Sequence, residues 1–208
     1  MDRRASGTAE VNTQTHVLLA LAIFSKRESP ARNWAIFSGA MATDIFIYIG
    51  LIYYGLISGD GVGTYFNEIY FQPHMQFWSA LSNSLPIYAG LALIGYLFRK
   101  QTWAYLLLFF ALAAFTQSLI DLPVHAEDAH RHFWPFSDWR FISPVSYWDA
   151  NHYGRIVGQL DNLLGLICIY ILWRRFPEFR VRVVLSIFVV LYAVFVIGGL
   201  IAPLLFGG

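Results

Sequence analysis

Charged side chains are scarce in this sequence of 208 residues. Asp, Glu, Lys and Arg make up 13% of the chain and hydrophobic residues make up 57%, whereas a soluble globular domain is about 25% charged. The net charge of +1 gives no electrostatic basis for binding nucleic acid. The scarcity of charge therefore argues against an ordinary soluble domain and favours a membrane protein.

The sequence also has a single cysteine and no visible internal repeat. The only cysteine, Cys168, lies in an apolar stretch, so an internal disulfide and any cysteine-based zinc site are excluded. No internal repeat is visible, which disfavours a transporter built from inverted halves. Metal chemistry in this chain would have to use imidazole and carboxylate groups.

Long apolar stretches recur along the chain. A bilayer core is crossed by roughly 20 apolar residues, and four stretches reach or approach that length, while two are shorter. The four longer stretches are Trp34–Ile57, Trp103–Leu122, Val157–Trp173 and Val183–Phe206. The two shorter ones are Leu85–Phe98 and Thr15–Phe24.

We therefore predict an all-α, polytopic transmembrane bundle of about five to six helices. Residues 1–208 form a single membrane-embedded domain, in which residues 1–14 are a polar tail. Residues 123–156 form one long extramembrane loop that carries the site. Charged residues separate the first two apolar stretches, so we do not expect a cleaved secretory signal.

Two ionisable residues lie within or beside the first apolar stretches. Asp44 stands ten residues after Trp34, and His16 stands ten residues before Lys26. At about 1.5 Å per residue, both lie roughly 15 Å from the turn between their helices, so antiparallel helices would hold them at one depth. Ionisable residues inside a membrane are costly and usually functional. The alternatives are that Asp44 is a satisfied structural group and that His16 only caps its helix.

The predicted loop concentrates polar chemistry. Four of the six histidines and five of the thirteen acidic residues lie between residues 121 and 152. Pro123 can begin a helix, on which His125, Asp128 and His132 would share one face while His130 points elsewhere. Imidazole and carboxylate ligands suit Zn, Mn, Fe or Mg. We therefore predict a divalent metal site of unidentified metal, with a merely solvated polar loop as the alternative.

The predicted roles follow from these positions. We expect His16, Asp44, Asp121 and His125 to converge although they come from different parts of the chain, with His132 as a further ligand. The catalytic base is predicted to be Asp128 or Glu127. Residues predicted to bind substrate, the arginines by holding a phosphate, are Arg131, Arg140, Asp149 and His152. The arginines can equally be anchors at the membrane interface.

The remainder of the loop, residues 133–149, is rich in aromatic residues and proline. Such a segment is too aromatic for a disordered linker. A long ordered loop of this kind usually packs as a lid or as the wall of a site.

The chain resembles the YdjM-type family of inner-membrane proteins, which are described as metal-dependent hydrolases. Thr15-His16 matches the Thr-His of that family, Thr43-Asp44 matches part of its Pro-Asp-x-Asp, and Trp134-Pro135-Phe136 matches its Trp-Pro-Phe. Asn83 and Gln117 stand where the family has histidines. The resemblance implies a membrane-embedded hydrolase, with a ligand set moved to His125, Asp128 and His132 or an inactive site.

Three functions are compatible with these observations. The first is a metal-dependent hydrolase of the bacterial inner membrane that acts on a lipid-linked or phosphoester substrate. The second is a small transporter or ion-conducting protein, in which Asp44 and Asp161 are intramembrane charges. The third is a non-catalytic assembly protein whose aromatic loop binds a partner. The lipid bilayer is the partner common to all three.

The distribution of basic residues predicts the orientation. The connections 25–33, 99–100 and 174–182 carry nine Lys and Arg, against five elsewhere, and the excess marks the cytoplasmic side. We therefore expect the 123–156 loop to be extracytoplasmic. A reporter enzyme that is active only outside the cytoplasm, fused after Ser137, should be active. A cytoplasmic reporter that works at the same position would reverse the orientation.

Overall fold

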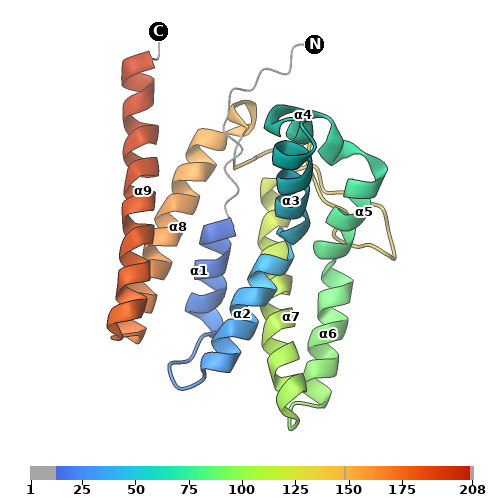
Figure 1. Ribbon diagram of the computed structural model, residues 1–208, viewed down its shortest axis with the longest axis vertical. Coiled ribbons are helices and arrows are strands. Elements are labelled where there is room, and N and C mark those ends of the chain that lie inside the picture. Colours follow the sequence, from blue (N-terminus) through green and yellow to red (C-terminus); the bar gives the residue numbers. More distant parts are fainter. Residues whose placement is uncertain (1–12, 148, 207–208) are drawn as a thin grey trace.

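The computed structural model describes residues 13–147 and 149–206, with side chains as far as residue 198. Every regular element among these residues is a helix, so the predicted all-α class is confirmed. Residues 1–12, most of the predicted polar tail, lie outside the described residues. The helices form an open bundle with its loops at two opposite ends (Figure 1).

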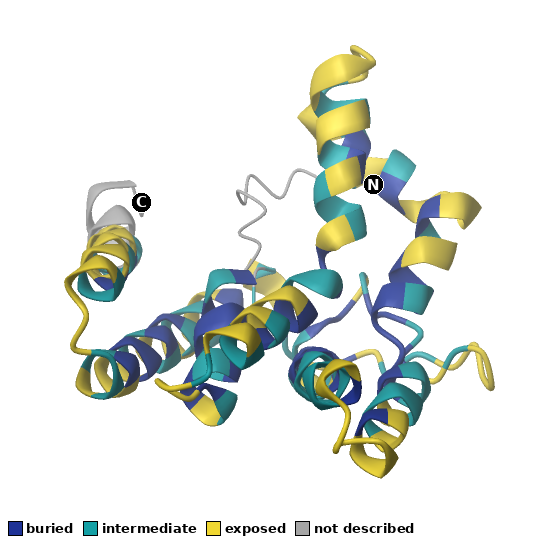
Figure 2. Ribbon diagram, turned by 60° about the horizontal axis from the view of Figure 1, so that its bottom comes forward, coloured by how far each residue is buried: buried dark blue, intermediate teal, exposed yellow. Residues whose placement is uncertain are grey.

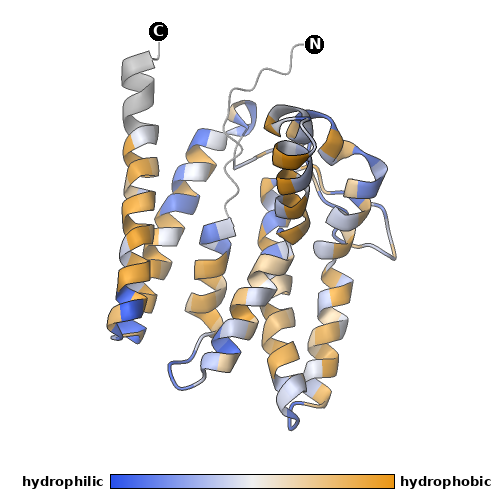
Figure 3. Ribbon diagram, in the orientation of Figure 1, coloured by the Kyte–Doolittle hydropathy of each residue, from blue (hydrophilic) through white to orange (hydrophobic). Residues whose placement is uncertain are grey.

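Four helical segments are long and apolar enough to cross a membrane. They are Pro73–Leu97, Thr102–Val124, Gly154–Arg175 and Phe179–Gly198. The first combines α5 (Pro73–Ser82) with α6 (Leu85–Leu97), and the others contain α7 (Thr102–Asp121), α8 (Gly154–Arg175) and α9 (Phe179–Phe206). Apolar residues fill the middle of these helices, as the colouring in Figure 3 shows. The chain therefore has the build of a membrane protein.

A fifth span is possible only as a broken one. The stretch predicted as Trp34–Ile57 consists of α2 (Pro30–Ala42), α3 (Ile45–Gly50) and the π-helix η1 (Leu51–Ile57). The two halves are bent by 61°. The break falls at Thr43 and Asp44, where the Asp44 side chain bonds another helix rather than capping α3.

Helix α1 (Thr13–Phe24) has 12 residues and is too short for a span by the same measure. The described residues thus contain four candidate spans, or five if the bent pair crosses as one. The predicted range of five to six is met only at its lower end. Because α1 packs against α2, α7 and α8, it is surrounded by other helices on several sides.

Helix α7 is the centre of one half of the bundle, where glycines allow very close packing. A Cβ atom on Gly39 of α2 would lie 2.1 Å from the carbonyl oxygen of Phe110 in α7, and one on Gly95 of α6 would lie 2.6 Å from the backbone nitrogen of Leu108. Backbones this close leave no room for a side chain. Helices α2, α6 and α7 therefore form a tightly packed unit.

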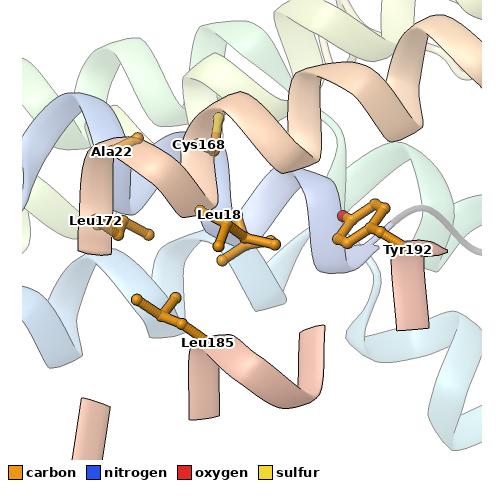
Figure 4. Packing of buried hydrophobic residues seen from close by; sticks show 7 residues of the cluster. Leu18, Ala22, Cys168, Leu172, Leu185 and Tyr192 are labelled. Carbon is orange, nitrogen blue, oxygen red and sulfur yellow. The ribbon is translucent and has the colours of Figure 1, made fainter. Parts of the chain in front are cut away.

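The other half of the bundle is built from α1, α8 and α9. Leu18 and Ala22 of α1 pack against Cys168 and Leu172 of α8, with Tyr192 and Leu185 coming from α9 (Figure 4). Much of α9 is exposed (Figure 2), as expected for a helix that faces lipid.

The helix predicted to follow Pro123 is absent. Only a 3-10 turn, η3 (Leu122–Val124), forms, and His125 is extended with φ −114° and ψ 126°. The carbonyl oxygens that a helix would use accept bonds from distant residues instead. Tyr147 N donates to Val124 O at 3.3 Å, and Ser143 N donates to His125 O at 2.9 Å. Residues 125–147 of the loop are ordered, as predicted, and backbone bonds within the loop contribute to that order.

Close packing at Gly39 gives a stability prediction. Gly39→Ala should destabilise the protein by about 1–3 kcal/mol because the new methyl group meets the backbone of α7. Gly90→Ala is the matched control, since a Cβ there meets nothing within 4 Å and alanine favours the helix. Thermal unfolding in detergent measures both variants. Equal melting temperatures would show that α2 and α7 do not touch at Gly39.

Candidate carboxylate–histidine site

Ionisable side chains from different segments meet at one end of the bundle. His16 Nε2 of α1 lies 3.3 Å from Asp121 Oδ1, at the end of α7, and His125 Nε2 lies 3.8 Å from the same oxygen. All three side chains are buried. The structure thus brings together three of the residues expected to converge, and two imidazoles flank a single carboxylate oxygen.

The orientation of His125 is set by Asp128. His125 Nδ1 donates a hydrogen bond of 2.8 Å to Asp128 Oδ2, because an ionised carboxylate can only accept. The opposite ring nitrogen is thereby directed at Asp121. Burial alone would lower the pKa of His125, but the charges of Asp128 and Asp121 outweigh it and raise this pKa to about 10.

Asp44 joins the site through helix α1. The Thr13 hydroxyl donates a hydrogen bond to Asp44 Oδ2, and Tyr48 OH donates to Thr13 Oγ1 at 2.9 Å. Thr13 lies one turn before His16 on the same helix. The sequence predicts that Asp44 and His16 lie at the same depth, and the bond between Asp44 and Thr13 agrees with this prediction.

Two further histidines line the loop side of this cluster. The ring of His130 lies 4.7 Å from that of His125 and 5.6 Å from that of His132, so the prediction that His130 points elsewhere is wrong. It failed because the helix that would have turned His130 away does not form. His130 Nδ1 is 2.9 Å from Ser79 Oγ. Burial, followed by the neighbouring positive charge of His125, lowers the pKa of His130 to about 3.

His132 has a defined tautomer. Its Nδ1 donates to the backbone oxygen of Asn83 at 3.2 Å, and a carbonyl can only accept. The lone pair of the neutral ring is therefore on Nε2. Burial lowers the pKa of His132, which favours this neutral form.

Helix α1 also links the site to α8 and α9. Thr15 Oγ1 donates to Asp161 Oδ2 at 2.7 Å and lies 2.6 Å from Tyr192 OH. Asp161, considered as an intramembrane charge, is thus bonded within the bundle. Thr13, Thr15 and His16 each connect α1 to a different partner.

The two loop arginines fasten the loop to helix α5. Arg131 donates to the backbone oxygen of Gln76 at 2.7 Å and to Asp138 Oδ1 at 2.9 Å. Arg140 donates to the backbone oxygen of Ala129 and to Gln76 Oε1, both at 2.9 Å. A phosphate would need guanidinium donors that these contacts already use. The predicted phosphate clamp remains a prediction.

The other predicted residues are less buried than the cluster. Glu127 is exposed. His152 Nδ1 donates to Asp149 Oδ2 at 2.6 Å. His152 ends the 3-10 turn η4 (Ala150–His152), and Asp149 directly precedes this turn. These residues form a local pair, and their predicted role in substrate binding also remains a prediction.

The spacing of the donor atoms bears on metal binding. Bonds of about 2.0–2.2 Å in a tetrahedral site separate neighbouring ligand atoms by roughly 3.3–3.6 Å. The two imidazole–Asp121 distances, 3.3 and 3.8 Å, lie at or near this range. Over residues 13–147 and 149–206, however, no three His, Cys, Asp or Glu side chains are positioned to hold a metal ion. The site offers suitable donors, but no complete set of ligands.

Several contributors gave no clear signal in the sequence. Thr13, Ser79 and Gln76 are ordinary polar residues in helices, and only their long-range contacts give them a role. His130 was visible as part of the histidine cluster, but its orientation depended on a loop conformation that local sequence does not determine.

Comparison with protein-family models, with curated proteins and with solved structures found no match to this chain. The class that the fold defines is an all-helical membrane protein with a buried carboxylate–histidine cluster. The resemblance to the YdjM-type family remains a prediction.

The arginine contacts give a second stability prediction. Arg140→Lys should destabilise the protein by about 1–3 kcal/mol, because one ammonium group cannot reproduce both guanidinium bonds. Arg155→Lys is the control, since Arg155 is exposed. Thermal unfolding without added ligand measures the difference. If both variants melt together, Arg140 does not fasten the loop.

Proposed function

We propose that this chain is a metal-dependent hydrolase embedded in the bacterial inner membrane, with its site near the extracytoplasmic surface. The observation that carries the proposal is the meeting of His16 Nε2 and His125 Nε2 at one oxygen of Asp121. These groups come from helices and a loop that are distant in sequence. Such a cluster is costly to bury unless its charges are compensated, and a divalent cation would compensate the carboxylates in place of the proton on His125.

The residues present fit such an ion in chemistry. Imidazole and carboxylate donors suit Zn, Mn, Fe or Mg. His16, Asp121 and His125 would hold the ion, with Asp44 or His132 completing the set after side-chain adjustment. Among residues 13–147 and 149–198, no group bonds the Nδ1 atom of His16, so they do not hold this ring by a second bond. Binding requires His125 to lose its proton, since a ligand imidazole is neutral.

A bound divalent ion would lower the pKa of water and polarise the bond to be broken. The protein groups around it have their own tasks. Asp128 orients His125 through the 2.8 Å bond, as carboxylates do for ligand histidines in many metal sites. We therefore assign Asp128 the role of orienting His125, and its predicted role as the catalytic base is the alternative. Glu127, which is exposed, is then the candidate base nearest to solvent.

The depth of the site suggests the kind of substrate. Asp121 ends a helix of membrane-spanning length, so the reacting group would meet the site close to the bilayer surface. A lipid-linked substrate or a phosphoester with a lipid tail can present its polar end at this depth. The loop held by Arg131 and Arg140 would form the outer wall.

The broken span supports a second candidate function. Discontinuous helices at ion-binding sites are typical of transporters, and Asp44 stands at the break between α2 and α3. The contact of Asp44 with Thr13 next to the histidine cluster favours the hydrolase, because it joins the break to the same site. Ion flux through liposomes containing the protein, without hydrolysis, would favour transport.

Metal content tests the proposal directly. Protein purified in detergent should carry about one divalent ion per chain by elemental analysis. Asp121→Asn and His125→Ala should each lower this occupancy by 10-fold or more in dilute metal, since each removes a proposed ligand. His74→Ala, an exposed histidine outside the cluster, should leave it unchanged. Wild-type protein that never retains a divalent ion would refute a metal-dependent function.

A further inference from the structure

Three buried polar side chains without charge, two of them one turn before Asp121 in α7, have atoms that lack hydrogen-bond partners among the described residues. Gln117 and Ser118 are fully buried, and neither the Gln117 amide atoms nor the Ser118 hydroxyl has a hydrogen-bond partner in the part of the chain that the structure describes. Asn83 is buried, and its Oδ1 has no partner among these described residues either. An unsatisfied buried polar group costs about 1–3 kcal/mol. Groups of this kind in a folded protein are normally satisfied by water or a ligand.

Helical geometry places these groups against the candidate site. Gln117 and Ser118 precede Asp121 by four and three residues in α7, so the three residues share one face of the helix. Side chains lean toward the N-terminus of their helix. The Asp121 carboxylate therefore leans back over Gln117 and Ser118, one turn deeper in the bundle.

The same depth is reached from α2. Gly39 touches Phe110, and the two helices rise together from that contact toward the site. Thr43 lies about 6 Å above Gly39, and Gln117 lies about 10 Å above Phe110. The carbonyl of Thr43 accepts a bond of 3.4 Å from Asn83 Nδ2. Asn83 thus lies beside the break between α2 and α3, and the height of Gln117 differs from that of Thr43 by about 4 Å.

The orientation of the Asn83 amide is fixed by its donor side. Nδ2 donates to Thr43 O at 3.4 Å, to Ser79 O at 3.1 Å and to Ser82 Oγ at 3.3 Å. Three acceptors around one nitrogen determine which end of the amide is which. The end left without a partner is therefore the acceptor Oδ1.

The mixture of donors and acceptors identifies the ligand by its chemistry. An anion would satisfy only donors, and a bare cation would satisfy only acceptors and leave Gln117 Nε2 without a partner. Water both donates and accepts, and it is small enough for a fully enclosed place. We propose that Gln117, Ser118 and Asn83 bind ordered water beneath Asp121. Where the proposed hydrolase function holds, this water supplies the hydrolytic reaction, with Gln117 as a positioning residue.

The water site is tested by the sign of a stability change. Gln117→Met keeps the size of the side chain and removes its amide. If the amide binds water, the melting temperature should fall by at least about 2 °C relative to Leu119→Met, an exposed position on the same helix. If the amide is buried without any partner, removing it should raise the melting temperature, and that result would overturn the proposal.

A second measurement covers a variant that does not fold. A wild-type structure at a resolution that shows water should contain solvent density within about 3.2 Å of the Gln117 amide. Dry density there would also overturn the proposal.

The proposed role of this water in hydrolysis is tested by a separate measurement. In a working hydrolase assay, Gln117→Met should lower kcat by about 10–100-fold, with KM and metal content unchanged. If the water is present and no hydrolysis occurs with any divalent metal, the water site stands and the proposed function fails. If kcat is unchanged while hydrolysis is intact, the water site does not serve the reaction.

Discussion

A carboxylate buried at the end of a membrane-spanning helix must be compensated, and Asp121 imposes this constraint on the whole fold. Its compensation comes from His16 in α1 and from His125, which follows Asp121 by only four residues. His125 reaches the Asp121 carboxylate from a segment that has left the helix, because the 3-10 turn after α7 ends at Val124 and His125 is extended. The extended chain also brings the ring of His130 to 4.7 Å from that of His125, so the absence of a helix after Pro123 shapes the site.

The long loop completes this compensation because it is braced from outside. Gln76 accepts bonds from both Arg131 and Arg140, and Ser84 Oγ donates to the backbone oxygen of Trp134 at 2.5 Å. These bonds hold the loop over the junction of α5 and α6. His130 and His132 are then buried beside His125 without belonging to any helix, which makes the loop part of the interior.

The sequence predicts the membrane class and the depth of His16 and Asp44 because both follow from local counting. A run of apolar residues gives a span, and 1.5 Å per residue gives a height. The positions of His130 and His132 could not be obtained in this way. They depend on bonds between Val124 and Tyr147 and between His125 and Ser143, which join residues about twenty apart and replace a helix that the local sequence favoured.

Helix α1 shows how polar residues can define a position that apolar residues leave open. Its leucines and alanines are spread around the helix, so apolar packing alone would accept several rotations about its axis. Thr13, Thr15 and His16 remove this freedom, because they reach Asp44, Asp161 and Asp121 on three sides. A slip of one residue would turn α1 by about 100° and break all three contacts together. The three acidic partners therefore determine both the rotation and the register of this short helix.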